Sequence, residues 1–270
     1  MIATFLAQYA AGCFLAVSVS SIRQSSWRYL RLMAIVSTAI AILAGVFLFR
    51  EAGGAISEIP PSILISLACG VLLGFVWLFV NAAQSEQVRA TQRIWPAGAG
   101  LVCLVAAAQL ALRSGTATIS SDVSTGAIQG IAVVISTILG AGLLGSATAA
   151  MLLGHRYLTD TNMPIGPLRR LTRIYLGVIA LRIVWVTAAS LPIWSAGFRP
   201  ADSPMYFWMA LSVRIGAGLV VAGVFAWMVW DCVKRRATQS ATALFYLSML
   251  LIFIGELSGQ YLMRTEQLAL

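Results

Sequence analysis

Three ionisable side chains interrupt stretches of sequence that are otherwise apolar enough to lie in lipid. Arg182 and Arg214 each lie within such a stretch, and Glu256 lies in a third, IFIGELSGQYLM (252–263). An isolated charge at membrane depth costs several kcal/mol, and charges kept there commonly belong to ion pathways, proton relays or ligand sites. We therefore expect these three side chains to pair inside a helix bundle, either as a functional site or as an ion pair that only fixes helix packing.

Two guanidiniums and one carboxylate leave one positive charge in excess. Water, backbone carbonyls or a ligand oxygen would offset it, and quinone carbonyls and small anions both suit that role. In the quinone hypothesis, Glu256 exchanges a proton as quinol is oxidised, and Arg182 or Arg214 polarises a quinone oxygen. Gln260 follows Glu256 by four residues, which places it on the same helix face and in the predicted quinone- or anion-binding site. Thr187 follows Arg182 by five residues and is expected to reach the same cavity.

The elements that must hold these residues are transmembrane helices. Of the 270 residues, 60% are apolar and only 10% are charged, with a mean hydropathy of +0.89, whereas soluble domains are about 25% charged. A helix needs roughly 20 apolar residues to span the hydrocarbon. The sequence predicts a single all-α membrane domain over 1–270, with eight spans at about 2–20, 32–49, 60–82, 94–112, 126–153, 172–193, 205–230 and 241–263.

The basic residues predict the orientation, because cytoplasmic loops carry an excess of Arg and Lys. Most of them follow the first, third, fifth and seventh spans: Arg23, Arg28, Arg31, Arg89, Arg93, Arg156, Arg169, Arg170, Arg173, Lys234, Arg235 and Arg236. Both termini are therefore expected on the non-cytoplasmic side of a bacterial inner membrane. Counted from the outer ends at about 1.5 Å per residue, the three buried charges then share one layer about 10 to 16 Å deep. The net charge of +9 fits this bias and contact with anionic lipids, and it does not indicate nucleic-acid binding.

Metal and haem sites are disfavoured by the residue types. His155 is the single histidine, so the chain cannot supply both axial ligands of a bis-histidine haem by itself. The four cysteines, at positions 13, 69, 103 and 232, form no CxxC motif, so we expect no metal site and read each as a small buried apolar residue. The stretch 152–173 is expected to be a connecting loop, because Pro164 and Pro167 block a continuing helix.

The segment GELSGQYL (255–262) resembles the last helix of the membrane anchor subunits of dimethyl sulfoxide reductase and polysulfide reductase. Those subunits have a Gly-Glu-Leu followed by Gly-Arg-Tyr, eight helices and, in the dimethyl sulfoxide reductase branch, no haem. The present chain has Gln260 where that pattern has arginine. The resemblance implies a subunit that passes electrons from quinol to an attached iron–sulfur partner.

The leading hypothesis from the sequence is thus an integral membrane subunit of a redox complex, not catalytic alone, that binds menaquinone or ubiquinone. Iron–sulfur or cytochrome proteins would be its partners, with lipids around it. Two alternatives remain open. The surplus positive charge would suit a small-anion or solute transporter, and the same charges would also suit a scaffold subunit of a respiratory or photosynthetic complex.

Overall fold

The structure, a computed structural model, describes residues 1–19, 27–82, 94–115, 123–159, 164–194, 204–266 and 268–270. Within these ranges the chain is helical, and eight helical segments are long and apolar enough to cross a membrane. The expected all-α, multi-pass membrane bundle is confirmed. Its elements are α1 (Ile2–Val19), α2 (Trp27–Glu51), the short 3-10 helix η1 (Ile56–Glu58), α3 (Pro61–Ala82), α5 (Ile94–Gly115), α6 (Val123–Thr159), α7 (Gly166–Trp194), α8 (Pro204–Ser212), the π-helix η2 (Val213–Val221), α9 (Ala222–Lys234) and α10 (Thr238–Thr265).

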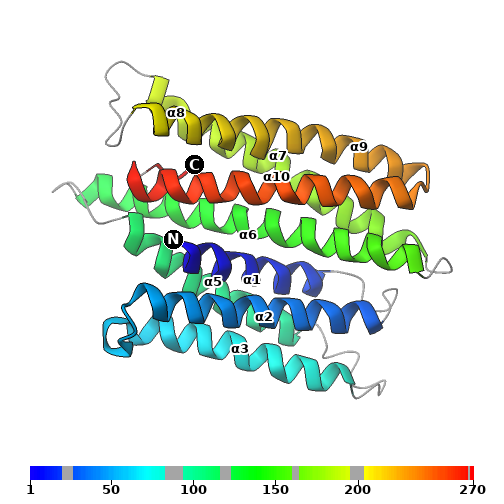
Figure 1. Cartoon of the computed structure of the whole chain (residues 1–270), viewed down its shortest axis with the longest axis horizontal. Coiled ribbons are helices and arrows are strands. Elements are labelled where there is room, and N and C mark those ends of the chain that lie inside the picture. Colours follow the sequence, from blue (N-terminus) through cyan, green and yellow to red (C-terminus); the bar gives the residue numbers. More distant parts are fainter. Residues whose placement is uncertain (20–26, 83–93, 116–122, 160–163, 195–203, 267) are drawn as a thin grey trace.

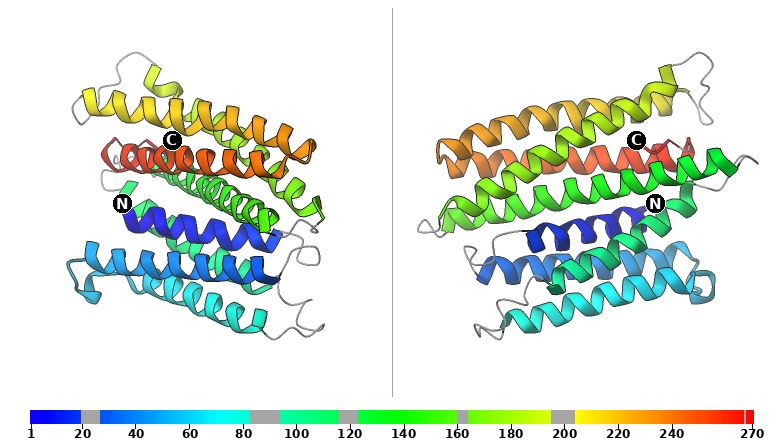
Figure 2. Two further views of the ribbon diagram at one scale, coloured as in Figure 1. Left: turned by 45° about the vertical axis from the view of Figure 1, so that its right-hand side comes forward. Right: turned by 180° about the vertical axis from the view of Figure 1, so that it is seen from behind.

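The spans form two groups of four. Helices α1, α2, α3 and α5 pack around one another, and so do α6, α7, the continuous α8–η2–α9 segment and α10. Figure 1 shows the first group in blue to teal and the second in green to red, with α1 beside α6 at the centre. The two further views in Figure 2 keep the same division. Both ends of the described chain lie toward the same end of the bundle, as an even number of spans requires (Figure 1).

Small residues bring the two groups together. A Cβ at Gly12 of α1 would lie 1.9 Å from the backbone oxygen of Ala141 in α6, and one at Gly145 would lie 2.0 Å from the backbone of Gly12. In lipid, no hydrophobic force drives helices together, so they associate through van der Waals packing. Small residues favour this packing because they let the two backbones approach closely. The α1–α6 crossing is therefore a direct backbone contact that fixes the centre of the bundle.

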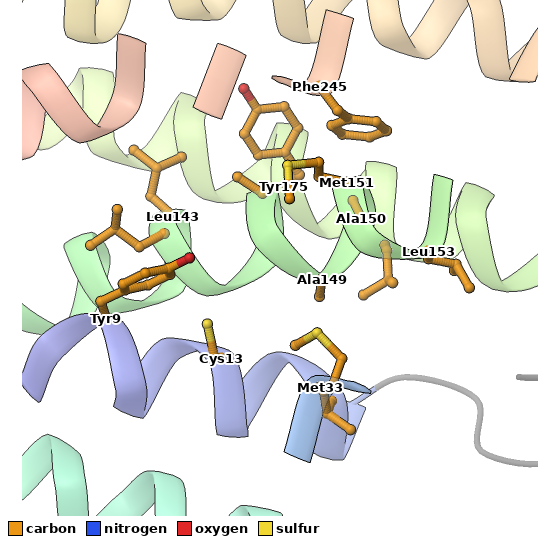
Figure 3. Packing of buried hydrophobic residues seen from close by; sticks show 14 of the residues in the cluster. Tyr9, Cys13, Met33, Leu143, Ala149, Ala150, Met151, Leu153, Tyr175 and Phe245 are labelled. Atoms are coloured by element: carbon orange, nitrogen blue, oxygen red, sulfur yellow. The ribbon is translucent and has the colours of Figure 1, made fainter. Parts of the chain in front are cut away.

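Around this crossing the core is aromatic and sulfur-rich, as Figure 3 shows. Tyr9 of α1 accepts a hydrogen bond from the Thr148 hydroxyl of α6 at 3.1 Å. Tyr175 of α7 shares a hydroxyl hydrogen bond with Ser248 of α10 and packs on Phe245 with ring centroids 5.9 Å apart. These hydroxyl groups of the core are thus paired, as a low-dielectric interior favours.

The outer surface is apolar instead. Phe79, Val184 and Trp227 are 75%, 65% and 69% exposed, which fits helices whose solvent is lipid. Cys69 also lies on this surface, so the expectation that every cysteine is buried is wrong for it. Cys13 and Cys103 are buried, and Cys232 is half-buried.

The stretch expected as a loop at 152–173 is mostly helical. Helix α6 continues to Thr159, and α7 already begins at Gly166. Pro167 does not end a helix here. An N–H in the first helical turn has no acceptor within the helix, so proline loses no hydrogen bond at this position. Arg169, Arg170 and Arg173 consequently lie in the first two turns of α7, and His155 is exposed near the end of α6.

Candidate functional site

The three charges predicted to pair do meet. Arg182 comes from α7, Arg214 from η2 and Glu256 from α10, and these residues are 2%, 0% and 2% exposed. Arg182 donates from Nε and Nη2 to the two carboxylate oxygens of Glu256 at 3.1 and 2.9 Å. Arg214 donates from Nη1 to Oε1 of Glu256 at 2.8 Å. Glu256 thus accepts three charge-assisted hydrogen bonds, which are the stronger class.

Oxygen atoms of Ser136 and Leu270 accept from several of the other guanidinium nitrogens. Arg182 Nη1 donates to the backbone and side-chain oxygens of Ser136 in α6, at 2.9 and 3.0 Å. Nη2 of Arg182 and Nη2 of Arg214 both donate to the backbone oxygen of Leu270, at 3.3 and 3.2 Å. These acceptors lie against the positive charge that Glu256 alone does not balance.

Glycines make room for Arg214 against α10. A Cβ at Gly218 would lie 2.6 Å from the Cα of Gly255, and a Cβ at Gly255 would lie 2.4 Å from the Cα of Gly218. A Cβ at Gly259 would lie 3.1 Å from the guanidinium carbon of Arg214. The glycines of GELSG therefore let a π-helical segment, a feature often found at functional sites, lie directly on the helix that carries Glu256.

Gln260 is buried beside the cluster, yet its partner is not one of the three charges. Its Nε2 donates to Oε1 of Gln8 in α1 at 2.7 Å. Gln8 and Glu256 both crowd Gly140 of α6, where a Cβ would lie 1.8 Å from Gln8 Nε2 and 2.7 Å from Glu256 Oε2. The polar layer thus extends from the second helical group into the first.

The expectation for Thr187 is wrong. Its hydroxyl donates to the Ile183 backbone oxygen of its own helix at 2.8 Å, and the residue is exposed on the outer surface. Thr187 is five residues from Arg182. At 3.6 residues per turn, the two side chains therefore point to different faces of the helix.

Three contributors to the site were not expected: Gln8, Ser136 and the tail that follows α10. The sequence could have indicated Gln8, because a glutamine within an apolar span needs a hydrogen-bond partner when it is buried. It could not have indicated Ser136, because a serine in a helix usually donates to its own backbone.

The tail, residues 268–270, folds back into the bundle. Trp185 Nε1 donates to the Ala269 backbone oxygen at 3.1 Å, and the Ser136 hydroxyl donates to the Leu270 backbone oxygen at 3.2 Å. Leu270 is 1% exposed and packs in the cluster of apolar side chains that includes Val186 and Leu262. The tail therefore closes the arginine cluster on one side.

An apolar groove of about 560 Å³ lies on the adjacent face of α10. Its lining residues come from α8, η2 and α10: Tyr206, Met209, Ala210, Val213, Leu257, Ser258 and Tyr261. Val213 immediately precedes Arg214, and Leu257 immediately follows Glu256. The groove and the cluster thus share η2 and α10, although none of the three charged residues is among those that line the groove.

The arrangement offers a fixed, water-poor group of charges beside an apolar groove. Within the described ranges, no three His, Cys, Asp or Glu side chains lie together as metal ligands would. The cluster can thus hold an electronegative oxygen near two guanidiniums, and the groove can receive an apolar molecule from lipid. Comparison with known proteins adds no relative, since no family model, curated protein or solved structure matches the chain.

Proposed function

We propose that this chain is an integral membrane subunit of a redox complex in the bacterial cytoplasmic membrane, and that it binds menaquinone or ubiquinone and anchors its partner subunits. Iron–sulfur or cytochrome proteins hold the redox centres in this proposal. The observation that carries it is the apolar groove between α8 and α10, whose lining residues Val213 and Leu257 are the chain neighbours of the ion-paired Arg214 and Glu256.

The groove suits a quinone because its lining combines aromatic rings with a few polar atoms. Tyr206 and Tyr261 offer rings for a flat headgroup, and Met209 and Leu257 offer apolar surface for an isoprenoid chain. The Ser258 hydroxyl donates to the Ile254 backbone oxygen at 2.9 Å, which leaves its oxygen lone pairs for a quinol hydroxyl. A groove of this kind fills directly from the lipid, where quinones dissolve.

The cluster supplies the electrostatic part of the proposal. Two guanidiniums against one carboxylate give a positive field beside the groove, and that field favours a quinone oxygen as it gains electron density. Glu256 is held by three donors, so proton exchange through it requires one arginine to move away first. Gln260 acts indirectly in this scheme, by fixing α10 to Gln8 of α1.

Quinone binding by the purified chain tests the proposal. The chain is reconstituted in lipid nanodiscs, and tryptophan fluorescence is followed as decylubiquinone or a menaquinone analogue is added. Ser258→Phe fills the groove and should weaken binding at least about tenfold, which corresponds to about 1.4 kcal/mol. Ser66→Phe is the matched control, because the Ser66 hydroxyl also bonds the backbone four residues earlier, at 2.7 Å, on the distant helix α3. Equal quinone affinity in both variants would refute the groove as the site.

One observation favours a second candidate, the scaffold subunit. All three charged side chains are at most 2% exposed, and most N–H groups of the two guanidiniums donate to oxygens of the chain itself. Closed ion clusters of this kind can serve packing alone. A complex purified with this chain should then keep full quinol-linked turnover in Ser258→Phe, whereas the quinone-binding role predicts a loss of turnover at unchanged subunit composition.

A further inference from the structure

The turn between α9 and α10 holds an arginine in a backbone conformation that favours glycine. Arg236 has a φ of 59°, in the left-handed region, where a Cβ crowds the backbone. The Arg236 amide donates to the Val233 oxygen at 3.3 Å, and the Ala237 amide donates to the Cys232 oxygen at 2.9 Å. Glycine is the usual residue at the centre of this hydrogen-bond pattern. Strained positions of this kind cluster at sites with a role other than folding.

Arg236 belongs to a larger group of cations at the end of the bundle opposite both termini (Figure 1). This basic corner comprises Arg169, Arg170 and Arg173 of α7 with Lys234, Arg235 and Arg236 of the α9–α10 turn. Arg169 Nη2 donates to the Lys234 backbone oxygen at 3.4 Å, which joins the start of α7 to the end of α9. Among the described residues one acid pairs with the corner, Asp231, whose Oδ2 lies 2.9 Å from Arg235 Nε. The corner therefore carries a large surplus of positive charge.

Several guanidinium donors of the corner have no acceptor within the described chain. Nε of Arg169 is buried without a hydrogen-bond partner there. The side chains of Arg170, Arg173 and Arg236 are exposed, and none of them has an ion pair or a hydrogen bond to another described residue. Guanidinium donors match the oxygens of a phosphate group in geometry and charge. The corner is thus equipped to bind a phosphate.

The position of the corner favours lipid as the source of that phosphate. The arginines of α7 lie in the first two turns of a span that runs from Gly166 to Leu191, which is the level of the lipid headgroups. Gly177 lies four residues after Arg173 on the same helix face and is exposed. A Cβ at Gly177 would meet nothing within 4 Å. An acyl chain can therefore lie against the α7 backbone on the membrane side of the arginines.

We propose that the basic corner binds the phosphate of an anionic phospholipid, whose acyl chains lie along the exposed face of α7. Arg170, Arg173 and Arg236 donate to the phosphate oxygens, and Arg169 positions them by fixing α7 to the end of α9. The charge of Arg236 is favourable when the lipid is bound, which accounts for an arginine at a position that suits glycine. This inference does not depend on quinone binding.

Thermal unfolding of the full chain in a neutral detergent tests the site, with phosphatidylglycerol as the probe and phosphatidylcholine at the same mole fraction as the control. Phosphatidylglycerol should raise the Tm by about 4 °C or more above the value with phosphatidylcholine. Inorganic phosphate at the same concentration should give no such rise, because it has no acyl chains to bury. An equal rise with both lipids overturns the proposal, and so does a rise with inorganic phosphate as large as that with phosphatidylglycerol.

Arg236→Gly separates the two roles of this position by the sign of its effect. Without anionic lipid the substitution should raise the Tm by about 1–3 °C, because it relieves the left-handed strain and removes one of several like charges. With phosphatidylglycerol the same variant should lose about a third or more of the lipid-dependent rise, because each basic residue supplies part of the attraction to an anionic lipid.

Two further variants show whether the corner itself binds the lipid. Arg170→Gln removes one charge of the corner at an ordinary helical position and should also reduce the lipid-dependent rise. Arg31→Gln is the matched control, because Arg31 is exposed near the start of α2, at the same end of the bundle in the other helical group (Figure 1). It should keep the full rise. An undiminished rise in both Arg236→Gly and Arg170→Gln overturns the proposal, and so does an equal reduction in Arg31→Gln.

Discussion

Arg182 lies edge-on to Glu256, with Nε and Nη2 donating to the two carboxylate oxygens at 3.1 and 2.9 Å from a neighbouring helix. Arg214 reaches Oε1 of the same carboxylate at 2.8 Å from η2. The single carboxylate thus joins three successive spans of the second helical group. Its removal would leave two buried guanidiniums without a counter-charge.

Glu256→Gln should therefore destabilise the chain by about 3–5 kcal/mol, the usual cost of breaking a buried ion pair. The measurement is unfolding of the detergent-solubilised protein, by heat or by titration with a denaturing detergent. The double variant Arg182→Gln/Glu256→Gln removes one charge of each sign and should lose less stability than the two single variants together. Additive losses would mean that the pair contributes no coupling energy.

The amide pair between the two helical groups gives a second prediction. Gln260 Nε2 donates to Gln8 Oε1 at 2.7 Å, and both residues are buried. Gln8→Leu should cost about 1–3 kcal/mol, because it leaves the amide of Gln260 unpaired. Gln8→Leu/Gln260→Leu removes both polar groups and should recover most of that loss in the same unfolding assay. A double variant that is less stable than either single variant would contradict this account.

The contact between η2 and α10 should tolerate no methyl group. Gly218→Ala places a Cβ 2.6 Å from the Cα of Gly255, so the two backbones must separate. We expect a loss of about 1–3 kcal/mol, as for other overpacked cores. Gly216→Ala in the same π-helix meets nothing within 4 Å and should change stability by less than about 0.5 kcal/mol. Equal effects of the two substitutions would show that this contact is looser in the membrane than in the structure.

Trp185 anchors the tail through one hydrogen bond. Trp185→Phe keeps most of the ring and removes the Nε1–H that donates to the Ala269 oxygen at 3.1 Å. We expect a net loss of about 0.5–1.5 kcal/mol in the holding of the tail. Hydrogen exchange at the Leu268 amide, which donates to the Leu262 oxygen at 3.4 Å, should accelerate accordingly. Unchanged exchange there would indicate that burial of Leu270 alone holds the tail.

The sequence predicted the spans and the pairing of the charges because lipid penalises each error strongly. Exposure of Arg182 or Arg214 to acyl chains would cost several kcal/mol. Pairing with Glu256 inside the bundle was therefore the arrangement of lower free energy. The helix ends were less constrained. Residues 166–171 were read as loop because Pro167 was treated as a barrier, although proline is well suited to a first helical turn.

The rest of the site depends on three-dimensional relationships without a local signature. Ser136 lies on α6, and its contact with Arg182 depends on how α6 and α7 cross. The return of residues 268–270 follows from acceptors that the cluster requires, which no neighbouring residue reveals. Gln260 was placed on the correct helix face, but its partner Gln8 is 252 positions away.

The π-helix has a consequence for the direction in which Arg214 points. A π turn bonds residue i to i+5 and so holds more residues than an α turn. If the nine residues from Val213 to Val221 wound as an α-helix instead, each would advance further around the axis, and everything before them would turn relative to α9. Arg214 would then point away from Glu256 with its chemical identity unchanged. The wide winding of this nine-residue segment is thus as necessary to the cluster as the arginine itself.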